Sequence, residues 1–369
     1  MADVKVCIMT SVHPAEDIRI YEKEAKALAR AGYKVMLLNS FKEKIISPNL
    51  RQIKVQSFKS RRSRICFSWG IYFQKAMKTK AEIIHFHDPE LLPAGLLLKF
   101  CGKKVIYDIH EDLPVQILYK PYLSSGMRKF LSSAAEITEN IFSRFFDVNI
   151  CATETIAKRF TKAQVIYNYP LLSEYNQYKQ YIKPYSQREK CLCYVGAITE
   201  NRGIFNMLDT VENTDLLLTL AGEFEDENTA MRCKIHWGFK NTEYIGFVDR
   251  QNVIKVMGES KIGLLLLNPT VNYMEALPIK MFEYFMSATP VICSNFPYWK
   301  NLFGDCAIYV NSTNPKEVRS AINMLLTNPE QAEKMGKRGQ TLVLEKYSFE
   351  KEEKKLLTLY KALARPGHG

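Results

Sequence analysis

The sequence has little of what disulfide-bonded or membrane-spanning proteins need. Its nine cysteines are scattered through 369 residues, and none forms a Cys-x-x-Cys pair or lies near histidines at zinc-finger spacing. No segment approaches the roughly 18 apolar residues of a membrane span, and the apolar stretch near the start is too short for a signal peptide. These absences predict reduced, mostly buried thiols in a cytoplasmic protein without a spanning helix.

The composition also lacks the bias of disordered or fibrous chains. Apolar residues make up 47% of the sequence and charged residues 24%, with 17 Gly and 15 Pro, which are ordinary values for a globular protein. At roughly 100–200 residues per domain, this length predicts two domains, each large enough to bury a core of its own.

Acidic residues are scarce in the first half. The net charge is +12; residues 1–165 hold 27 Lys and Arg against 16 Asp and Glu, whereas residues 166–369 hold 24 against 23. Residues 44–81 contain no acidic residue and ten basic ones, interleaved with aromatic and branched side chains. The basic residues are Lys44, Arg51, Lys54, Lys59, Arg61, Arg62, Arg64, Lys75, Lys78 and Lys80.

Such a stretch is typical of a surface that meets anionic lipid, where each cation near the membrane contributes about 1 kcal/mol. A solvated loop and helix without a partner is the alternative. Nucleic acid is disfavoured because the sequence has no zinc-finger, RNA-recognition or basic-zipper signature. We therefore expect Lys44–Lys80 to face an anionic membrane surface, and no nucleic-acid partner.

Short apolar runs alternate with helix-length stretches along the chain, which predicts parallel, doubly wound α/β sheets. A helix is expected over Tyr21–Arg30, where Gly32 follows as a stop signal. Strands are expected in the first half at Val4–Met9, Val35–Leu38, Ile83–Phe86, Val105–Tyr107, Val148–Cys151 and Val165–Ile166. Strands are expected in the second half at Leu192–Val195, Leu216–Ala221, Glu243–Ile245, Ile262–Leu267, Pro290–Ser294 and Ala307–Val310.

The alternation stops over 167–190, a tyrosine-rich segment with no clear period that we interpret as a linker. The predicted organisation is therefore a Rossmann-like domain over 1–166, a second over 191–348, and a charged helix within 349–369 that crosses back to the first domain.

The densest group of candidate site residues follows the predicted strand Ile262–Leu267. Pro278 suits the first turn of a helix running to about Ala288, whose free amides and positive dipole end favour phosphate. Glu275 lies just before that helix and Glu283 within it. Carboxylates beside an anion site are suited to sugar and ribose hydroxyls, because a carboxylate accepts hydrogen bonds from a diol.

Glu275-x7-Glu283 resembles the Glu-x7-Glu motif of the retaining GT-B glycosyltransferases of family 4, in particular those of bacterial O-antigen and capsule synthesis. Further segments in the same order resemble other motifs of that family. They are Tyr194-Val-Gly196 with Arg202-Gly203, Leu220-Ala-Gly222, Tyr244-Ile-Gly246-Phe247-Val248, His85-Phe-His87-Asp88-Pro89, and Val105 to Asp112 with His110. The resemblance implies two Rossmann-like domains that face an interdomain cleft.

The resemblance also implies roles for particular residues. Arg202 would hold the donor diphosphate with Lys280 as a further phosphate contact, Glu283 would bind the ribose, and Glu275 the transferred sugar. His110 would act beside the reacting sugar. The remaining candidates are Gly196, Gly222, Phe247, Val248, Leu277 and Pro278 on the donor side, and His13, Asp17, Arg19, His87 and Asp88 on the acceptor side.

Two positions depart from the family pattern. Ala197 stands where the family has a phosphate-binding arginine, so Lys280 or Arg19 is expected to replace it. The family's Gly-Gly loop after the first strand is replaced by Thr10 to Arg19, which leaves acceptor contacts there open.

By this resemblance we expect a retaining transferase that moves a sugar from a nucleotide sugar to a lipid-diphosphate-linked glycan at the inner face of the plasma membrane. UDP-GalNAc or UDP-GlcNAc is the expected donor. Neither a cofactor nor a metal is expected, because a cationic loop and a helix N-terminus can neutralise the leaving diphosphate. The alternatives are an epimerase on the same fold, or a catalytically idle protein that binds nucleotide or nucleic acid.

Overall fold

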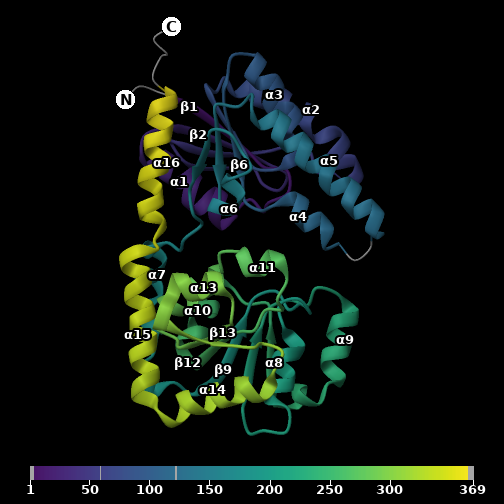
Figure 1. Ribbon diagram of the computed structural model, residues 1–369. Helices are drawn as coiled ribbons and strands as arrows, with labels where there is room; N and C mark the ends of the chain where they lie inside the picture. Colours follow the sequence, from purple (N-terminus) through teal and green to yellow (C-terminus); the bar gives the residue numbers. More distant parts are fainter. Residues whose placement is uncertain (1–3, 59, 121–122, 365–369) are drawn as a thin grey trace. The chain divides into compact units, whose positions relative to one another are not determined.

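The computed structural model describes residues 4–58, 60–120 and 123–364 (Figure 1). The chain forms two compact units. The first comprises Met1–Asn168 together with Phe349–Gly369, and the second comprises Tyr169–Ser348. The C-terminal segment thus belongs to the same unit as the N-terminal half of the chain.

The first unit contains an eight-stranded sheet in the order β3-β4-β2-β1-β5-β6-β7-β8. Every pair is parallel except β3 with β4. The chain moves from β1 to one side and later to β5 on the other, so the topological switch point lies between β1 and β5. The strands are β1 Lys5–Met9, β2 Lys34–Asn39, β3 Lys44–Ser47, β4 Leu50–Lys54, β5 Ile83–Phe86, β6 Lys104–Ile109, β7 Val148–Cys151 and β8 Ala163–Val165.

Helices cover both faces of this sheet (Figure 1). Ile84 and Phe86 of β5 pack with α2 and α3 in one hydrophobic cluster. His85, between them, points to the other face, where it contacts Tyr360 of α16. The helices are η1 Ile18–Ala25, α1 Lys26–Arg30, α2 Arg61–Thr79, η2 Pro89–Leu91, α3 Leu92–Phe100, α4 Leu113–Leu118, α5 Ser125–Ser143, α6 Glu154–Ala157 and α16 Phe349–Ala364.

The second unit contains a parallel six-stranded sheet in the order β11-β10-β9-β12-β13-β14. Its switch point lies between β9 and β12. The strands are β9 Lys190–Val195, β10 Leu218–Ala221, β11 Thr242–Gly246, β12 Ser260–Leu265, β13 Val291–Ser294 and β14 Ala307–Val310. The helices are α7 Leu172–Tyr178, η3 Lys179–Tyr181, η4 Tyr185–Gln187, α8 Ile204–Val211, α9 Glu227–Ile235, η5 Trp237–Asn241, α10 Arg250–Glu259, α11 Val271–Glu275, α12 Ile279–Met286, α13 Pro297–Phe303, η6 Gly304–Cys306, α14 Pro315–Thr327 and α15 Pro329–Lys346.

The predicted fold class is confirmed, because each unit is built on a doubly wound sheet with helices on both faces. The segment 167–190, which was predicted to be a linker without a clear period, contains helical elements. It forms α7 and two short helical turns of the second unit. Ile182 packs closely against Gly258: a Cβ added to Gly258 would lie only 2.8 Å from Cα of Ile182. The tyrosines of this segment and Ile182 do not follow the periodicity of a helix or a strand, so the sequence pattern did not predict these elements.

The predicted helix over Tyr21–Arg30 is also different. A π-helix, η1, begins at Ile18 and an α-helix continues only from Lys26. Hydrogen bonds from i to i+5 bring residues five apart onto one face, so Arg19 and Glu24 meet, with Nε 3.1 Å from Oε1.

Six of the nine free cysteines are buried, as expected for most of them, whereas Cys66 and Cys101 are exposed. Within the described residues, no helix is both long and apolar enough to cross a membrane.

Candidate active site

Three glycines follow neighbouring strands of the second unit. Gly196 follows β9, Gly222 follows β10 and Gly246 ends β11, with φ of 146°, 143° and 69°. A Cβ on Gly222 would lie only 1.8 Å from the carbonyl oxygen of Gly196. The structure thus brings Gly196 and Gly222 together at the carboxyl ends of adjacent strands, where bare backbone allows a ligand to approach closely.

Two cations lie beside Gly196. A Cβ there would be 3.3 Å from Cε of Lys280 and 3.6 Å from Nη1 of Arg202. Burial alone would lower the pKa of Arg202, but the phenols of Tyr194 and Tyr273 outweigh burial and raise it. Arg202 therefore stays charged, and with Lys280 it forms a positive site at the predicted position.

Glu283 is held by cations on both sides. Its Oε2 accepts from Nζ of Lys280 at 2.6 Å and its Oε1 from Nη1 of Arg250 at 2.5 Å. Arg250 is anchored in turn by Glu174 of α7, whose Oε2 accepts from Nη2 at 2.8 Å. Burial alone would raise the pKa of Glu283, but Arg250 and Lys280 lower it to about 2. The carboxylate is ionised and 8% exposed.

Glu275 differs from Glu283 in its surroundings. It is the last residue of α11 and its side chain is exposed. Leu277 and Pro278 connect α11 to α12, with Pro278 as the N-cap residue, and Trp299 fixes the turn by donating to the carbonyl of Ala276 at 3.0 Å. No side chain caps α12, so its first amides are available to a ligand. The helix ends at Met286, two residues before the predicted end.

The loop after β11 holds the last donor-side candidates. Phe247 is 75% exposed, and Val248 is half-buried. An exposed aromatic ring at a strand end offers a surface on which a nucleotide base can stack. Because β10 and β11 are parallel neighbours, Phe247 and Val248 lie at the same edge of the sheet as Gly222.

In the first unit, Asp88 organises the loop after β1. Its Oδ2 accepts from the backbone amide of Ser11 at 2.5 Å and from Oγ1 of Thr10 at 2.9 Å, and its Oδ1 lies 3.1 Å from Nδ1 of His13. Asp88 occupies the N-cap position of η2, but its side chain makes no capping hydrogen bond there. The contact with Asp88 raises the pKa of His13 despite burial, which acts in the opposite direction.

His13, His87 and His110 form a chain of contacts at this edge. Nδ1 of His87 lies 2.9 Å from Nε2 of His110, and the rings of His13 and His110 are 5.2 Å apart. His87 is buried, whereas the His110 side chain is 18% exposed. His110 follows β6 and can therefore reach a ligand from a position fixed by the neighbouring strand.

Two acceptor-side candidates are engaged inside the protein. Asp17 is the N-cap of η1 and accepts from the amides of Arg19 and Ile20. Arg19 is 4% exposed and donates to Asp108 at 2.9 Å and to the carbonyl of Ile166 at 3.2 Å. A guanidinium that is buried and paired in this way has no route to a phosphate, so we withdraw Arg19 as the replacement for the arginine missing at Ala197.

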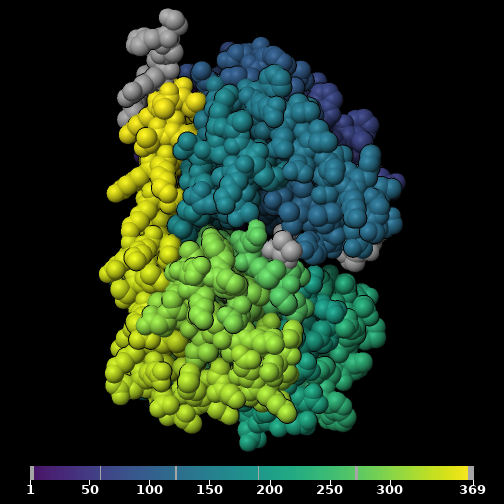
Figure 2. Space-filling model, viewed as in Figure 1, coloured from purple at the N-terminus to yellow at the C-terminus, as the bar shows by residue number. Residues whose placement is uncertain are grey.

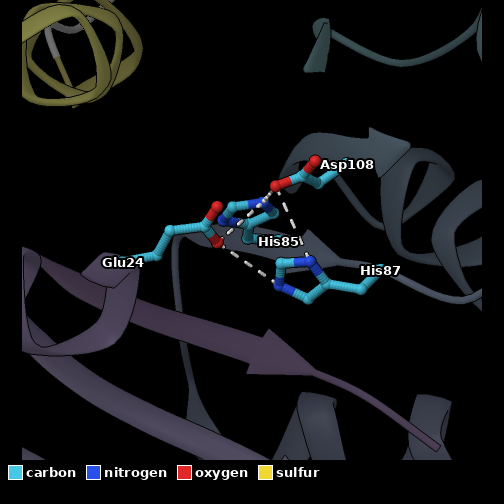
Figure 3. A group of neighbouring side chains, drawn as sticks. All are labelled: Glu24, His85, His87 and Asp108. Atoms are coloured by element: carbon cyan, nitrogen blue, oxygen red, sulfur yellow. Dashed lines mark ion pairs between the residues drawn. The ribbon is translucent and has the colours of Figure 1, made fainter. Parts of the chain in front are cut away.

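Sequence reasoning missed Arg250 and the buried acids Glu24 and Asp108. Arg250 is the first residue of α10, directly after the Phe247–Asp249 loop, and this position near a predicted ligand loop was the available signal. Figure 3 shows that Glu24 and Asp108 enclose His85 and His87. Asp108 precedes His110 by two residues, but no sequence pattern pairs it with Glu24.

Two family models match the chain. The model described as Glycosyltransferase Family 4 matches residues 21–168, and the model described as Glycosyl transferase-like matches residues 205–358. Between them they span most of both units. A curated relative, the D-rhamnosyltransferase WbpZ of Pseudomonas aeruginosa, is 22% identical over 294 residues, which cover 74% of this chain and 72% of the relative.

Solved structures share the fold along the whole chain. Sucrose-phosphate synthase from Thermosynechococcus elongatus superposes with a TM-score of 0.73 at 15% identity, covering 98% of this chain and 99% of the other. HepE from Anabaena, in complex with UDP, superposes with a TM-score of 0.70 at 11% identity, covering 97% of this chain and 100% of HepE. An α,α-trehalose-phosphate synthase from Burkholderia vietnamiensis superposes with a TM-score of 0.72 at 10% identity, covering 98% of this chain and 99% of the synthase.

Proposed function

We propose that the chain is a GT-B glycosyltransferase that transfers a sugar, with retention, from a UDP-sugar to a lipid-diphosphate-linked glycan; the two glycosyltransferase family models and the shared fold support this proposal. The observation that carries the proposal is the positive site of Arg202 and Lys280 beside Gly196, next to the carboxylate of Glu283. A nucleoside diphosphate needs both features, cations for its phosphates and an acceptor for its ribose hydroxyls.

Each donor-side residue has a part in this proposal. Arg202, Lys280 and the first amides of α12 bind the diphosphate and stabilise the charge that develops on it as the sugar leaves. Glu283 accepts from the ribose, and Glu275 binds the transferred sugar. Lys280 takes the place of the arginine missing at Ala197. These cations supply the charge neutralisation, so we propose a transfer that needs no metal.

His110 is the proposed catalytic residue in the first unit. It is partly exposed, and its Nε2 is oriented by Nδ1 of His87 at 2.9 Å. The leaving phosphate takes the proton of the acceptor hydroxyl on the face from which it departs, and the ring of His110 holds the reacting sugar there. Asp88 fixes the loop that carries His13 on the acceptor side.

The UDP bound by the Anabaena neighbour supports a uridine donor. UDP-GalNAc and UDP-GlcNAc are the sugars we propose first. The D-rhamnosyltransferase relative makes a nucleoside-diphosphate rhamnose the second candidate, in O-antigen or capsule synthesis.

The proposed location is the inner face of a bacterial membrane, and the first unit carries a surface suited to it. The expected basic stretch forms β3, β4 and α2, with Lys59 outside the described residues. Arg51 pairs with Glu43 and Arg64 with Glu90, so these two cations are partly neutralised. Figure 2 shows atoms of α3 and α5 at the surface of this unit.

Exposed apolar side chains, some of them within the basic stretch and others beyond it, extend this surface. Phe67 of α2 is 65% exposed, and Phe130 of α5 is 68% exposed. The helices α2 and α5 both pack against α3, and the three lie on one face of the sheet (Figure 1). Other exposed apolar residues on these three helices and in the turn that follows α5 are Ile65, Met77, Leu97, Phe100, Met127, Ile137, Ile141 and Phe145. We call this set, with Phe67 and Phe130, the apolar face. Cations beside an exposed apolar face match an anionic bilayer.

A donor-by-acceptor activity matrix tests the proposal. The full chain is incubated with radiolabelled UDP-GalNAc, UDP-GlcNAc, UDP-glucose and a nucleoside-diphosphate D-rhamnose, each with lipid-diphosphate sugar acceptors and with EDTA. We expect one donor to give an elongated lipid whose anomeric configuration, read by NMR, matches that of the donor. An inverted product contradicts retention, and product only with added Mg²⁺ contradicts metal independence. Interconversion of the UDP-sugars without acceptor would favour the epimerase.

A further inference from the structure

A second group of chemically reactive side chains lies inside the first unit, on the sheet face covered by η1 and α16 (Figure 3). Glu24 comes from η1, His85 from β5, His87 from just after β5, and Asp108 from β6. Glu24, His85 and Asp108 are 0% exposed and His87 is 4% exposed. Buried carboxylates and imidazoles in one place need a reason, because each costs free energy when it is removed from water without a partner.

The spacing of the four side chains is that of ligands around one ion. Oε2 of Glu24 lies 3.7 Å from Nε2 of His87 and 3.9 Å from Nε2 of His85. Oδ2 of Asp108 lies 3.4 Å from Nε2 of His85. It lies 3.7 Å from the His87 ring, a distance measured to the outward nitrogen Nδ1. Most of these separations exceed hydrogen-bonding distance. Metal bonds of about 2.0–2.1 Å in a tetrahedron place ligand atoms about 3.3 Å apart, so a small inward movement completes the set.

The unused hydrogen-bonding groups point to the same centre. Among the described residues, Oε2 of Glu24 and Nε2 of both His85 and His87 have no hydrogen-bond partner, whereas Oε1 of Glu24 is ion-paired with Arg19. Both Nδ1 atoms are bonded outward instead. That of His85 lies 2.8 Å from Oη of Tyr360, and that of His87 lies 2.9 Å from Nε2 of His110. Metal-binding histidines show this division, with one ring nitrogen on the ion and the other held by an outer partner.

We propose that Glu24, His85, His87 and Asp108 bind one Zn²⁺ ion. Two imidazoles and two carboxylates suit a four-coordinate zinc site. All four ligands are buried, so the site is closed and its role is structural: the ion joins η1, β5 and β6. This proposal does not depend on the proposed transfer, because no donor-side residue takes part in it; His87 is the one ligand that also contacts the proposed catalytic residue, His110.

Arg19 lies against the outer side of the two carboxylates. Its Nη2 donates to Oδ1 of Asp108 at 2.9 Å, with a longer bond of 3.2 Å to Oδ2, and its Nε is 3.1 Å from Oε1 of Glu24. The guanidinium orients both groups and offsets one negative charge, which leaves Oε2 of Glu24 directed at the histidines. If no metal binds, a proton takes its place, because burial raises the pKa of Glu24 well above its usual value.

Metal analysis of the full chain distinguishes these two states. The protein is produced without a polyhistidine tag, dialysed against a weak chelator, and analysed for all first-row transition metals. We expect about one zinc per chain. Protein unfolded with EDTA and refolded with Co²⁺ should show the visible absorption of tetrahedral cobalt. Less than a tenth of an ion per chain, together with no cobalt spectrum, would overturn the proposal and leave a protonated Glu24.

Matched variants locate the ion. Glu24→Gln removes one ligand, whereas Glu212→Gln changes a partly exposed group in which Asp209 and His236 could also hold a metal. We expect the first to lower zinc content at least tenfold and the second to leave it unchanged. If Glu24→Gln does not fold, His87→Gln is the second variant, and the cobalt spectrum of the wild type decides independently. Zinc retained in both ligand variants would place the ion elsewhere and refute the assignment.

Discussion

The guanidinium of Arg250 joins Glu174 of α7 to Glu283 of α12, donating to Oε1 of Glu283 at 2.5 Å. The carboxylate proposed to bind ribose is therefore fixed before any donor arrives. A preorganised acceptor loses little conformational freedom on binding, which favours affinity.

Replacing Glu283 by Gln should weaken UDP binding by roughly ten- to a hundredfold, because a hydrogen bond to a charged group is worth about 1.5–3 kcal/mol. Calorimetric titration with UDP measures the change. Glu330→Gln, an exposed carboxylate that pairs only with Lys334 in its own helix, is the control. An unchanged dissociation constant in Glu283→Gln would remove Glu283 from the ribose site.

The same residue should make stability depend on acid pH. The pKa of Glu283 is lowered to about 2, so its ionised form stabilises the folded state. That contribution, about 3 kcal/mol, is complete above the unfolded pKa of about 4.5 and declines as the pH falls toward 2. Urea unfolding between pH 6 and pH 3 should show the wild type losing its advantage over Glu283→Gln. A constant difference across that range would contradict the pKa shift.

Gly222 and Gly246 provide a matched pair of glycines. Gly222→Ala forces a Cβ to 1.8 Å from the carbonyl oxygen of Gly196, whereas a Cβ at Gly246 meets nothing within 4 Å. Both glycines have positive φ, so Gly246→Ala should lower the free energy of unfolding by about 1 kcal/mol through backbone strain alone. Gly222→Ala adds the steric clash and should lower it several times more. Thermal unfolding compares them. Equal losses would mean that the close approach of Gly222 to Gly196 is not rigid.

His110→Ala should lower kcat by roughly 10²-fold, because a misplaced reacting sugar costs about that much, while UDP affinity stays unchanged. His236→Ala, on the second unit, should leave both quantities unchanged. Initial rates and calorimetry on the same preparations separate the two effects. A parallel fall in UDP affinity would assign His110 to donor binding rather than to the reacting sugar.

Phe67→Ala combined with Phe130→Ala should reduce binding to anionic liposomes about tenfold or more, since each buried aromatic side chain is worth about 1.5–3 kcal/mol. Pelleting with phosphatidylglycerol vesicles at increasing salt measures both the apolar and the electrostatic contribution. Ile235→Ala removes a side chain that is 78% exposed on the second unit and is the control. Binding that ignores both salt and the double substitution would exclude this surface.

The sequence allowed prediction of the elements whose signals are local. Strands Ile83–Phe86 and Val148–Cys151 have the predicted bounds, and the helix Phe349–Ala364 lies within the predicted segment 349–369. Their apolar runs and terminal signals lie within a few residues of one another. The antiparallel edge strand β3 was missed because its residues Lys44–Ser47 are exposed or half-buried, so burial imposes no alternation on them.

The family resemblance selected Gly196, Gly222, Arg202, Lys280 and Glu283, and the structure places them near one another because strand ends converge on one edge of a parallel sheet. Their role in binding a donor remains a proposal. The role of Arg19 was not predictable, because it depends on a π-helix that aligns positions 19 and 24 and on Asp108, far away in the chain. Long-range pairing of charges leaves no periodic trace in a sequence.

The return of α16 to the first unit has a consequence for synthesis. The second unit is one continuous stretch, Tyr169–Ser348, and can complete its core as soon as it leaves the ribosome. The first unit lacks α16 until the second unit has been synthesised, and α16 carries Tyr360, which contacts His85. Until then α16 does not cover this face of the sheet. We therefore expect the first unit, although it is translated first, to finish folding after the second.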